Sequence, residues 1–274
     1  MAKSISVENL SQRIDLAETD NELGQLAIIL NQTFDRLQSA FEHQLRFTGD
    51  ASHELRTPLA VILSQTEFAL SKPRSSDEYR VALETCQRAS RRMKSLIDSL
   101  LLLARFDAGH PDLQQRPLDL AEVATESVEL LRPLADERKI VVTSAVTPVP
   151  LVGDRERLGQ VVTNLLANAI RYNDEGGRVD VRVERVNGHA VVSVSDNGIG
   201  IPADELPHIF ERFYRVDKAR TRSDGGSGLG LAICQSVVEA HGGQIVVRSE
   251  PQQGTTLEVQ LPILSETSKE LQNP

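Results

Sequence analysis

The chain has 274 residues, of which 30 are Lys or Arg and 39 are Asp or Glu, so its formal net charge is −9. This length allows one large domain or two modest ones whose cores need no disulfide or metal. The acidic excess would repel a phosphate backbone, so we expect no nucleic-acid partner, and Cys86 and Cys234 lack metal-ligand spacing and are predicted to be buried thiols.

The first part of the chain is predicted to form two helices. Residues 21–72 carry apolar side chains mostly three or four positions apart, which indicates a long amphipathic helix. Pro73 prevents that helix from continuing, and Ser76 with Asp77 can cap a second one. In the second helix, residues of a bundle seam recur at alternating intervals of three and four, namely Leu83, Cys86, Ser90, Met93, Ile97, Leu100 and Ala104.

Two helices joined by a short turn form an antiparallel hairpin. Each apolar seam is narrow, and one hairpin cannot shield both seams from water. The simplest solution is a homodimer in which two hairpins form a four-helix bundle. The alternative is that the hairpin packs on the downstream domain of its own chain.

After a predicted linker over residues 109–117, the pattern changes to a mixture of helices and strands. Helical periodicity covers residues 119–135, 155–171 and 232–240, whereas strand-like alternation covers residues 139–145, 179–186, 189–195, 244–250 and 255–261. This mixture predicts an α/β sandwich, a sheet with helices on one face, and hence an α+β chain overall. The polar residues 265–274 are predicted to be a disordered tail.

Three short stretches of the second domain suggest phosphate chemistry. Asn164, Asn168 and Arg171 share one helix face, and amide oxygens beside a cation suit a Mg²⁺ ion shared with phosphates, although such a stripe alone is more often a solvated face. Asp196 ends a strand before a turn on two glycines, where its carboxylate can accept a hydrogen bond from an amino group such as that of adenine. The glycine-rich loop 225–231 leads into an apolar helix and forms a plausible anion cradle.

In this order, the three stretches resemble the N, G1 and G2 boxes of the Bergerat-type ATP-binding domain shared by histidine kinases, gyrase and a heat-shock chaperone. Residues 209–215 resemble the F box of the kinases. The resemblance implies that Asn168 holds Mg²⁺ with support from Asn164 and Arg171, that Asp196 reads adenine, and that residues 203–227 form a lid. The cations of this lid would be Arg212, Arg215, Lys218, Arg220 and Arg222, and the other implied nucleotide-binding residues are Tyr172, Gly198, Gly200, Ile201, Phe210, Gly226, Gly228, Leu229, Gly230 and Leu231.

His53 stands in the middle of the first helix, about 100° around it from the seam residue Ser52, so its imidazole should face solvent. A histidine on a helix is by itself far more often a surface residue than a catalyst. The stretch from Ser52 to Leu59, however, resembles without a gap the H box of the commonest class of histidine kinase. The resemblance implies that His53 is the nucleophile, that Glu54 accepts the proton of the other ring nitrogen, and that Thr57 orients a water for dephosphorylation of a partner.

The whole pattern resembles that of a sensor histidine kinase. This resemblance implies a chain that phosphorylates itself with Mg²⁺ and ATP and relays the phosphoryl group to an aspartate of a response regulator. Residues 20–27 resemble the end of a HAMP module, and no apolar run approaches the ~20 residues of a membrane span. We therefore expect the cytoplasmic portion of a receptor of the bacterial cell membrane. Two rivals are a nucleotide-binding scaffold without transfer activity and an ATPase clamp like gyrase. The expected segments are 1–40 (partial HAMP and signalling helix), 41–108 (dimerisation and phosphotransfer), 109–117 (linker), 118–264 (ATP-binding) and 265–274 (tail).

Overall fold

A computed structural model describes residues 22–109, 111–216 and 226–263. Its backbone contacts divide the chain into two compact units, Met1–Met93 and Lys94–Pro274. We call the described part of the first unit the hairpin and residues 116–262 of the second unit the sandwich. Within the described residues, no helix combines the length and the apolar character that a membrane crossing requires. The first 21 residues, which include the first two residues of the HAMP-like stretch, and the predicted tail lie outside the described part.

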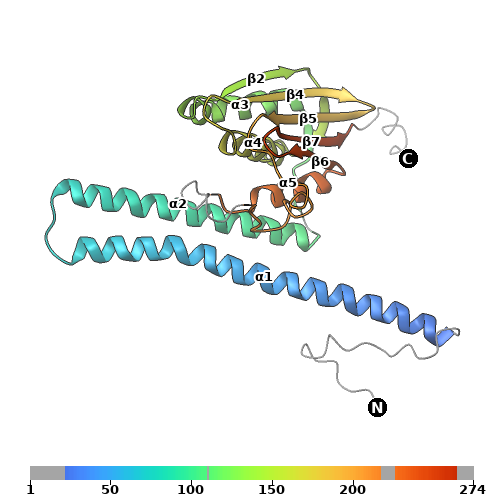
Figure 1. Ribbon diagram of the computed structural model, residues 1–274, viewed down its shortest axis with the longest axis horizontal. Coiled ribbons are helices and arrows are strands. Elements are labelled where there is room, and N and C mark those ends of the chain that lie inside the picture. The colour runs from blue at the N-terminus through green and yellow to red at the C-terminus, as the bar shows by residue number, and fades with distance from the viewer. Residues whose placement is uncertain (1–21, 110, 217–225, 264–274) are drawn as a thin grey trace, which may run out of the picture. The chain divides into compact units, whose positions relative to one another are not determined.

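The hairpin consists of helix α1, Glu22–Leu70, and the first part of helix α2 (Figure 1). Helix α2 spans Ser76–Asp107, and its residues up to Met93 belong to the hairpin. The two run antiparallel, because Cys86 of α2 meets the carbonyl of Ile62 whereas Arg92, further along α2, meets the earlier Glu54. The row of α2 that packs inside the hairpin includes Ala82, which is buried, whereas Leu83 of the predicted bundle seam is 69% exposed in the single chain. Both rows of α2 are apolar, so periodicity alone did not separate the row inside the hairpin from the row beside it.

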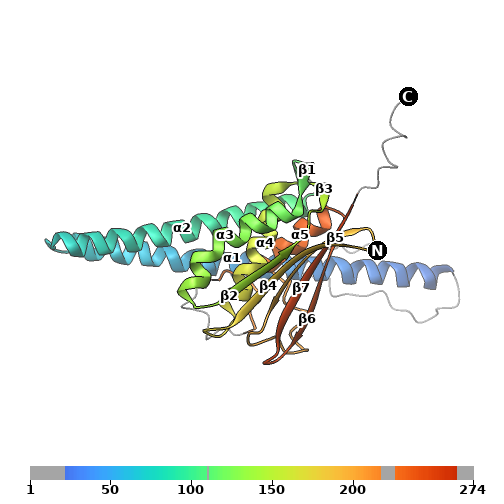
Figure 2. The ribbon, with the colours of Figure 1, turned by 90° about the horizontal axis from the view of Figure 1, so that it is seen from above.

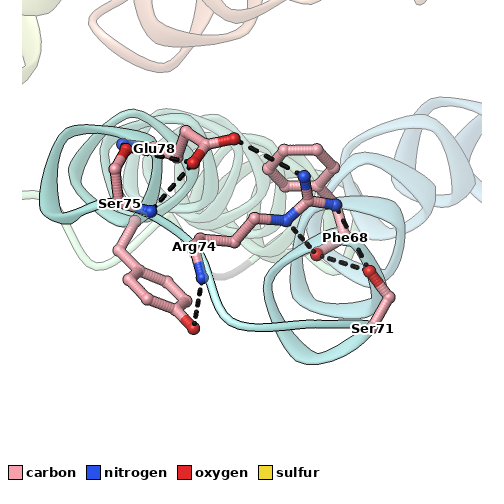
Figure 3. A network of polar contacts seen from close by, with 6 residues as sticks. Phe68, Ser71, Arg74, Ser75 and Glu78 are labelled. Carbon is pink, nitrogen blue, oxygen red and sulfur yellow. Dashed lines mark hydrogen bonds and ion pairs between the residues drawn. The ribbon is translucent and has the colours of Figure 1, made fainter.

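Polar contacts at the tip of the hairpin fix the turn between the two helices (Figure 3). The backbone N–H of Ser75 donates to the carboxylate of Glu78 at 2.8 Å, and the N–H of Glu78 donates to the hydroxyl of Ser75 at 3.3 Å. This reciprocal arrangement is a capping box, so the cap lies one residue before the predicted Ser76. Arg74 lies 3.8 Å above the ring of Phe68 and donates to the hydroxyl of Ser71, so it closes the turn.

The sandwich contains a five-stranded sheet in the order β2, β4, β5, β7 and β6. Strands β2 and β4 are parallel, and the other neighbours are antiparallel. The strands are β2 Val141–Val146, β4 Arg178–Val186, β5 His189–Asp196, β6 Gln244–Glu250 and β7 Gly254–Pro262.

Three helices cover one face of this sheet, as Figure 2 shows. They are α3 Leu120–Glu137, α4 Arg155–Arg171 and α5 Gly230–Ala240. Alternate residues of β4, namely Val179, Val181 and Val183, are buried, which is the pattern of a sheet with one covered face. The predicted fold class, a helical hairpin followed by an α/β sandwich, is confirmed.

A second, two-stranded sheet was not predicted from the sequence. It pairs β1, Arg116–Asp119, with β3, Pro150–Gly153, in antiparallel register. Residues 116 and 117, predicted as linker, therefore begin a strand. Asp119 fastens this small sheet to α3, because its carboxylate accepts from the backbone N–H groups of Ala121 and Val149 at 2.9 and 2.8 Å.

Candidate active site

His53 lies on α1 with an exposed side chain, as the sequence predicts. The carbonyl of His53 accepts a 3.4 Å hydrogen bond from the hydroxyl of Thr57, one turn further on. Glu54 is half-buried and forms an ion pair with Arg92 of α2. His53, Glu54 and Thr57 thus lie within about one turn of a single helix, with Glu54 also tied to the second helix.

The face of α4 that carries the asparagines is held in place by a buried opposite face. Leu165, Leu166 and Ile170 are fully buried, and the carboxylate of Asp154 caps the helix by accepting from the N–H of Arg157 at 3.1 Å. The opposite face of α4 carries the predicted residues, whose side chains are half-buried: Asn164, Asn168 and Arg171.

The two asparagines of this face differ in their contacts. The side-chain amide of Asn164 donates to the carbonyl of Gly230 at 3.3 Å, so it connects α4 to the first residue of α5. In the described part of the chain, the side chain of Asn168 has no hydrogen-bond partner, and its amide oxygen is a neutral hard donor of the kind that suits Mg²⁺. The residues present therefore fit a magnesium ion at Asn168, whereas Asn164 already has a structural contact.

Asp196 ends β5 with a half-buried carboxylate. Its Oδ1 accepts from the backbone N–H groups of Gly198 at 2.9 Å and Thr255 at 3.2 Å. Burial raises the pKa of this carboxyl, although the two N–H donors oppose the rise. No described residue donates to Oδ2, so this oxygen can accept a hydrogen bond from a ligand amino group.

The two glycines after Asp196 serve the turn itself. A β-carbon at Gly198 would come within 2.4 Å of the carbonyl oxygen of Tyr172, and at Gly200, where φ is +65°, within 2.0 Å of the carbonyl oxygen of Glu250. Close backbone packing therefore explains both glycines. The neighbouring Ile201 is anchored by a 2.8 Å hydrogen bond from its N–H to the hydroxyl of Ser249, and Tyr172 is partly exposed at the end of α4.

The glycine-rich loop contacts both the asparagine helix and the F-box stretch. Arg215 donates to the carbonyl of Gly226 at 2.9 Å, and a β-carbon at Gly226 would lie 3.1 Å from the guanidinium of Arg171. The carbonyl of Gly228 accepts from the N–H of Phe213 at 2.9 Å. Helix α5 begins at Gly230, two residues earlier than predicted, with the side chain of Leu229 fully buried and that of Leu231 half-buried.

The predicted lid is described only over residues 203–216 and 226–227. Phe210 is half-buried there, and Arg212 makes a bidentate ion pair with Asp107, at 2.6 and 2.8 Å. The hydroxyl of Tyr214 donates to the carboxylate of Glu205, which raises the pKa of Tyr214 to about 12. Lys218, Arg220 and Arg222 lie outside the described residues.

Two contacts near these stretches were missed by the sequence analysis. The buried His241 accepts from the N–H of Asp154 at 3.0 Å through Nε2 and donates from Nδ1 to the carbonyl of Val237 at 2.7 Å, so it joins the start of α4 to the end of α5. The other is the pair of Arg92 with Glu54. These two residues stand equally far from Pro73 in the sequence, which is a signal that the hairpin prediction already contained.

Comparisons with known proteins agree with this arrangement. Residues 43–109 match the family model of the His Kinase A (phospho-acceptor) domain, and residues 153–265 match that of the histidine kinase-, DNA gyrase B-, and HSP90-like ATPase. The sensor protein CutS of Streptomyces coelicolor is 38% identical over 263 residues, which cover 96% of this chain and 63% of CutS.

Two solved structures have the same fold over most of the chain. Full-length ShkA, in complex with AMPPNP, is 30% identical with a TM-score of 0.62, covering 77% of this chain and 44% of ShkA. The histidine kinase AdeS of Acinetobacter baumannii is 23% identical with a TM-score of 0.61, covering 78% of this chain and 98% of that structure, and it supports the fold alone.

The hairpin thus matches a phosphoacceptor domain, and the sandwich matches an ATPase domain of the type found in histidine kinases. The chain belongs to the sensor histidine kinase family. It spans between 51% and 63% of the length of the curated relatives that it matches.

Proposed function

We propose that this chain transfers the γ-phosphoryl group of ATP to His53, relays it to an aspartate of a response regulator, and also dephosphorylates that regulator. The observation that supports this function most directly is the exposed imidazole of His53 on α1, inside the stretch that matches the phosphoacceptor family. The nucleotide would come from the sandwich, whose family match is to ATPases.

Residues of the sandwich have distinct roles in this proposal. The amide oxygen of Asn168 would hold Mg²⁺, and the bound ion would supply positive charge at the ATP phosphates. Oδ2 of Asp196 accepts a hydrogen bond from the adenine amino group, since Oδ1 is already occupied by backbone donors. Arg215 holds the glycine-rich loop through the carbonyl of Gly226, and Arg171 supports the metal site at Asn168. The backbone N–H groups at the start of α5 would bind the phosphate anion.

The covalent step takes place at the imidazole. A neutral ring nitrogen of His53 attacks the γ-phosphorus, a P–N bond forms, and the bond from that phosphorus to the bridging oxygen breaks, so that ADP leaves with the electron pair. The proton on the other ring nitrogen is accepted by the carboxylate of Glu54. In the dephosphorylation of the regulator, the hydroxyl of Thr57 orients a water toward the phosphorylated aspartate.

The functional unit in this proposal is a homodimer of hairpins. Residues 41–108 form the dimerising phosphoacceptor segment and residues 118–264 the nucleotide segment, with the linker between them. The partial HAMP segment and the placement at the bacterial cell membrane remain predictions from the sequence.

Labelling with γ-labelled ATP and Mg²⁺ tests the proposed function. The wild-type chain should acquire acid-labile, alkali-stable label, and His53→Gln should acquire none, whereas the matched change of an exposed histidine in the sandwich, His189→Gln, should label normally. Asn168→Ala should lose at least about 100-fold in rate, because a metal at the phosphates carries much of the charge stabilisation. ATP binding without label would favour the scaffold, and ATP hydrolysis without label would favour the ATPase clamp.

A further inference from the structure

One ion pair of the hairpin joins the residue next to His53 to the opposite helix. Nη2 of Arg92, on α2, lies 3.3 Å from Oε2 of Glu54, on α1, and the two side chains are 34% and 31% exposed. The pairs Arg80 with Asp77 and Lys94 with Asp98 are local to α2 and much more exposed. Exposed local pairs contribute little to stability, so among these three pairs the cross-helix pair is the one whose geometry the fold imposes.

Neither partner has its hydrogen-bonding capacity filled. In the described part of the chain, Nε of Arg92 is buried without a hydrogen-bond partner. On Glu54, the described residues donate to Oε2 alone, which leaves Oε1 able to accept. The carboxylate is therefore held by one oxygen and available through the other.

We propose that Arg92 is a positioning residue that holds the carboxylate of Glu54 for its work on His53. This inference rests on the proposed function, because it assigns Arg92 a part in the same phosphoryl transfer. Arg92 restrains the rotation of the glutamate through its charge-assisted hydrogen bond to Oε2. Oε1 then accepts the ring N–H of His53, so the nitrogen that attacks phosphorus retains its lone pair.

A double-mutant cycle on the full chain tests this role. Arg92→Gln should lower kcat for autophosphorylation about 10-fold, whereas the KM for ATP should stay within about 2-fold, because the loss concerns the transfer step alone. Arg92→Lys keeps the charge and should retain at least about a third of kcat. In the Glu54→Gln background, Arg92→Gln should lower kcat by less than about 2-fold, since a residue that acts only through Glu54 has nothing left to position.

Arg91 provides the matched control, because it is exposed, adjacent on the same helix and changed by the same charge. Arg91→Gln should leave kcat unchanged. Arg92→Met preserves the apolar stem and is measured in the same cycle, so that a folding failure of one variant does not decide the result.

Two results would overturn the positioning role: a kcat of Arg92→Gln equal to that of Arg91→Gln, or losses that multiply in the Glu54→Gln background as independent structural damage would. Failure of the proposed function is a different result, the absence of label on wild-type His53.

Discussion

The hairpin and the sandwich differ in how completely each buries its apolar side chains. In the sandwich, Leu165 and Leu166 have no exposed surface. In the hairpin, Leu59, Leu63 and Leu83 are 46%, 53% and 69% exposed. The core of the sandwich is buried within one chain. A large apolar surface on a helix pair is typical of an interface, so we expect the hairpin to bury its apolar side chains against a partner.

The largest effect should come from opening a cavity in the buried core of the sandwich. Leu166→Ala should lower the free energy of unfolding of the sandwich by about 2–5 kcal/mol, because it removes a fully buried side chain from a close-packed interior. Chemical unfolding followed by circular dichroism at two protein concentrations measures this, and the loss should be the same at both. A loss that depends on concentration would mean that the sandwich core also depends on assembly.

For a leucine on the exposed side of the hairpin, the effect of substitution should depend on protein concentration, because it acts on the dimer. Leu63→Ala should weaken the dimer about 10- to 100-fold in dissociation constant, since a symmetric interface loses the same side chain twice. Sedimentation equilibrium measures the change. The exposed polar neighbour Ser64, about 100° around the helix from Leu63, is changed to alanine as the control and should leave the constant nearly unaltered.

If Leu63→Ala left the dimer intact, the exposed row of α1 would not be the interface. If the wild-type chain were monomeric at all concentrations, the comparison between the two regions would need another explanation, namely the intramolecular packing that the sequence left open.

The sequence predicted the fold where its patterns were long. Helix α4 has the predicted bounds, because seventeen residues of apolar periodicity leave little choice of period. Strands β1 and β3 were missed because each has only four residues, and the first two residues of β1 were assigned to the linker. On α2, periodicity did not separate the row inside the hairpin from the predicted bundle seam beside it, because a helix in a bundle can be apolar on two adjacent rows.

The candidate site was predictable where its chemistry is local. Asn168 and Asp196 stand in short stretches with a recognisable order, and both have side-chain atoms that no described residue occupies. The contact of His241 with Asp154 was not predictable, because it joins residues 87 positions apart whose types carry no mutual signal. Tertiary contacts of this kind follow from the packing of α4 and α5, which periodicity does not specify.

The smallest predicted effect on stability concerns the half-buried carboxylate of Asp196, whose negative charge lowers the stability of the sandwich. Burial raises the pKa of Asp196 above its value in the unfolded chain, so the folded state holds the proton more tightly. The stabilising contribution of this group is thus complete at acid pH and is lost as pH rises through the folded pKa. Asp196→Asn, which carries no charge, should therefore be slightly more stable than wild type near neutral pH, and this advantage should shrink on acidification.

Urea unfolding without nucleotide, at neutral and acid pH, measures the difference, with the exposed Asp204→Asn as the control. The same Asp196→Asn variant should bind ATP at least about 10-fold more weakly, because it replaces a charged acceptor of the adenine amino group. A variant that is less stable than wild type at neutral pH would mean that the carboxylate is held for the backbone donors of Gly198 and Thr255. In that case the main role of Asp196 would be to stabilise the fold of the sandwich, and other residues would have to provide its selectivity for adenine.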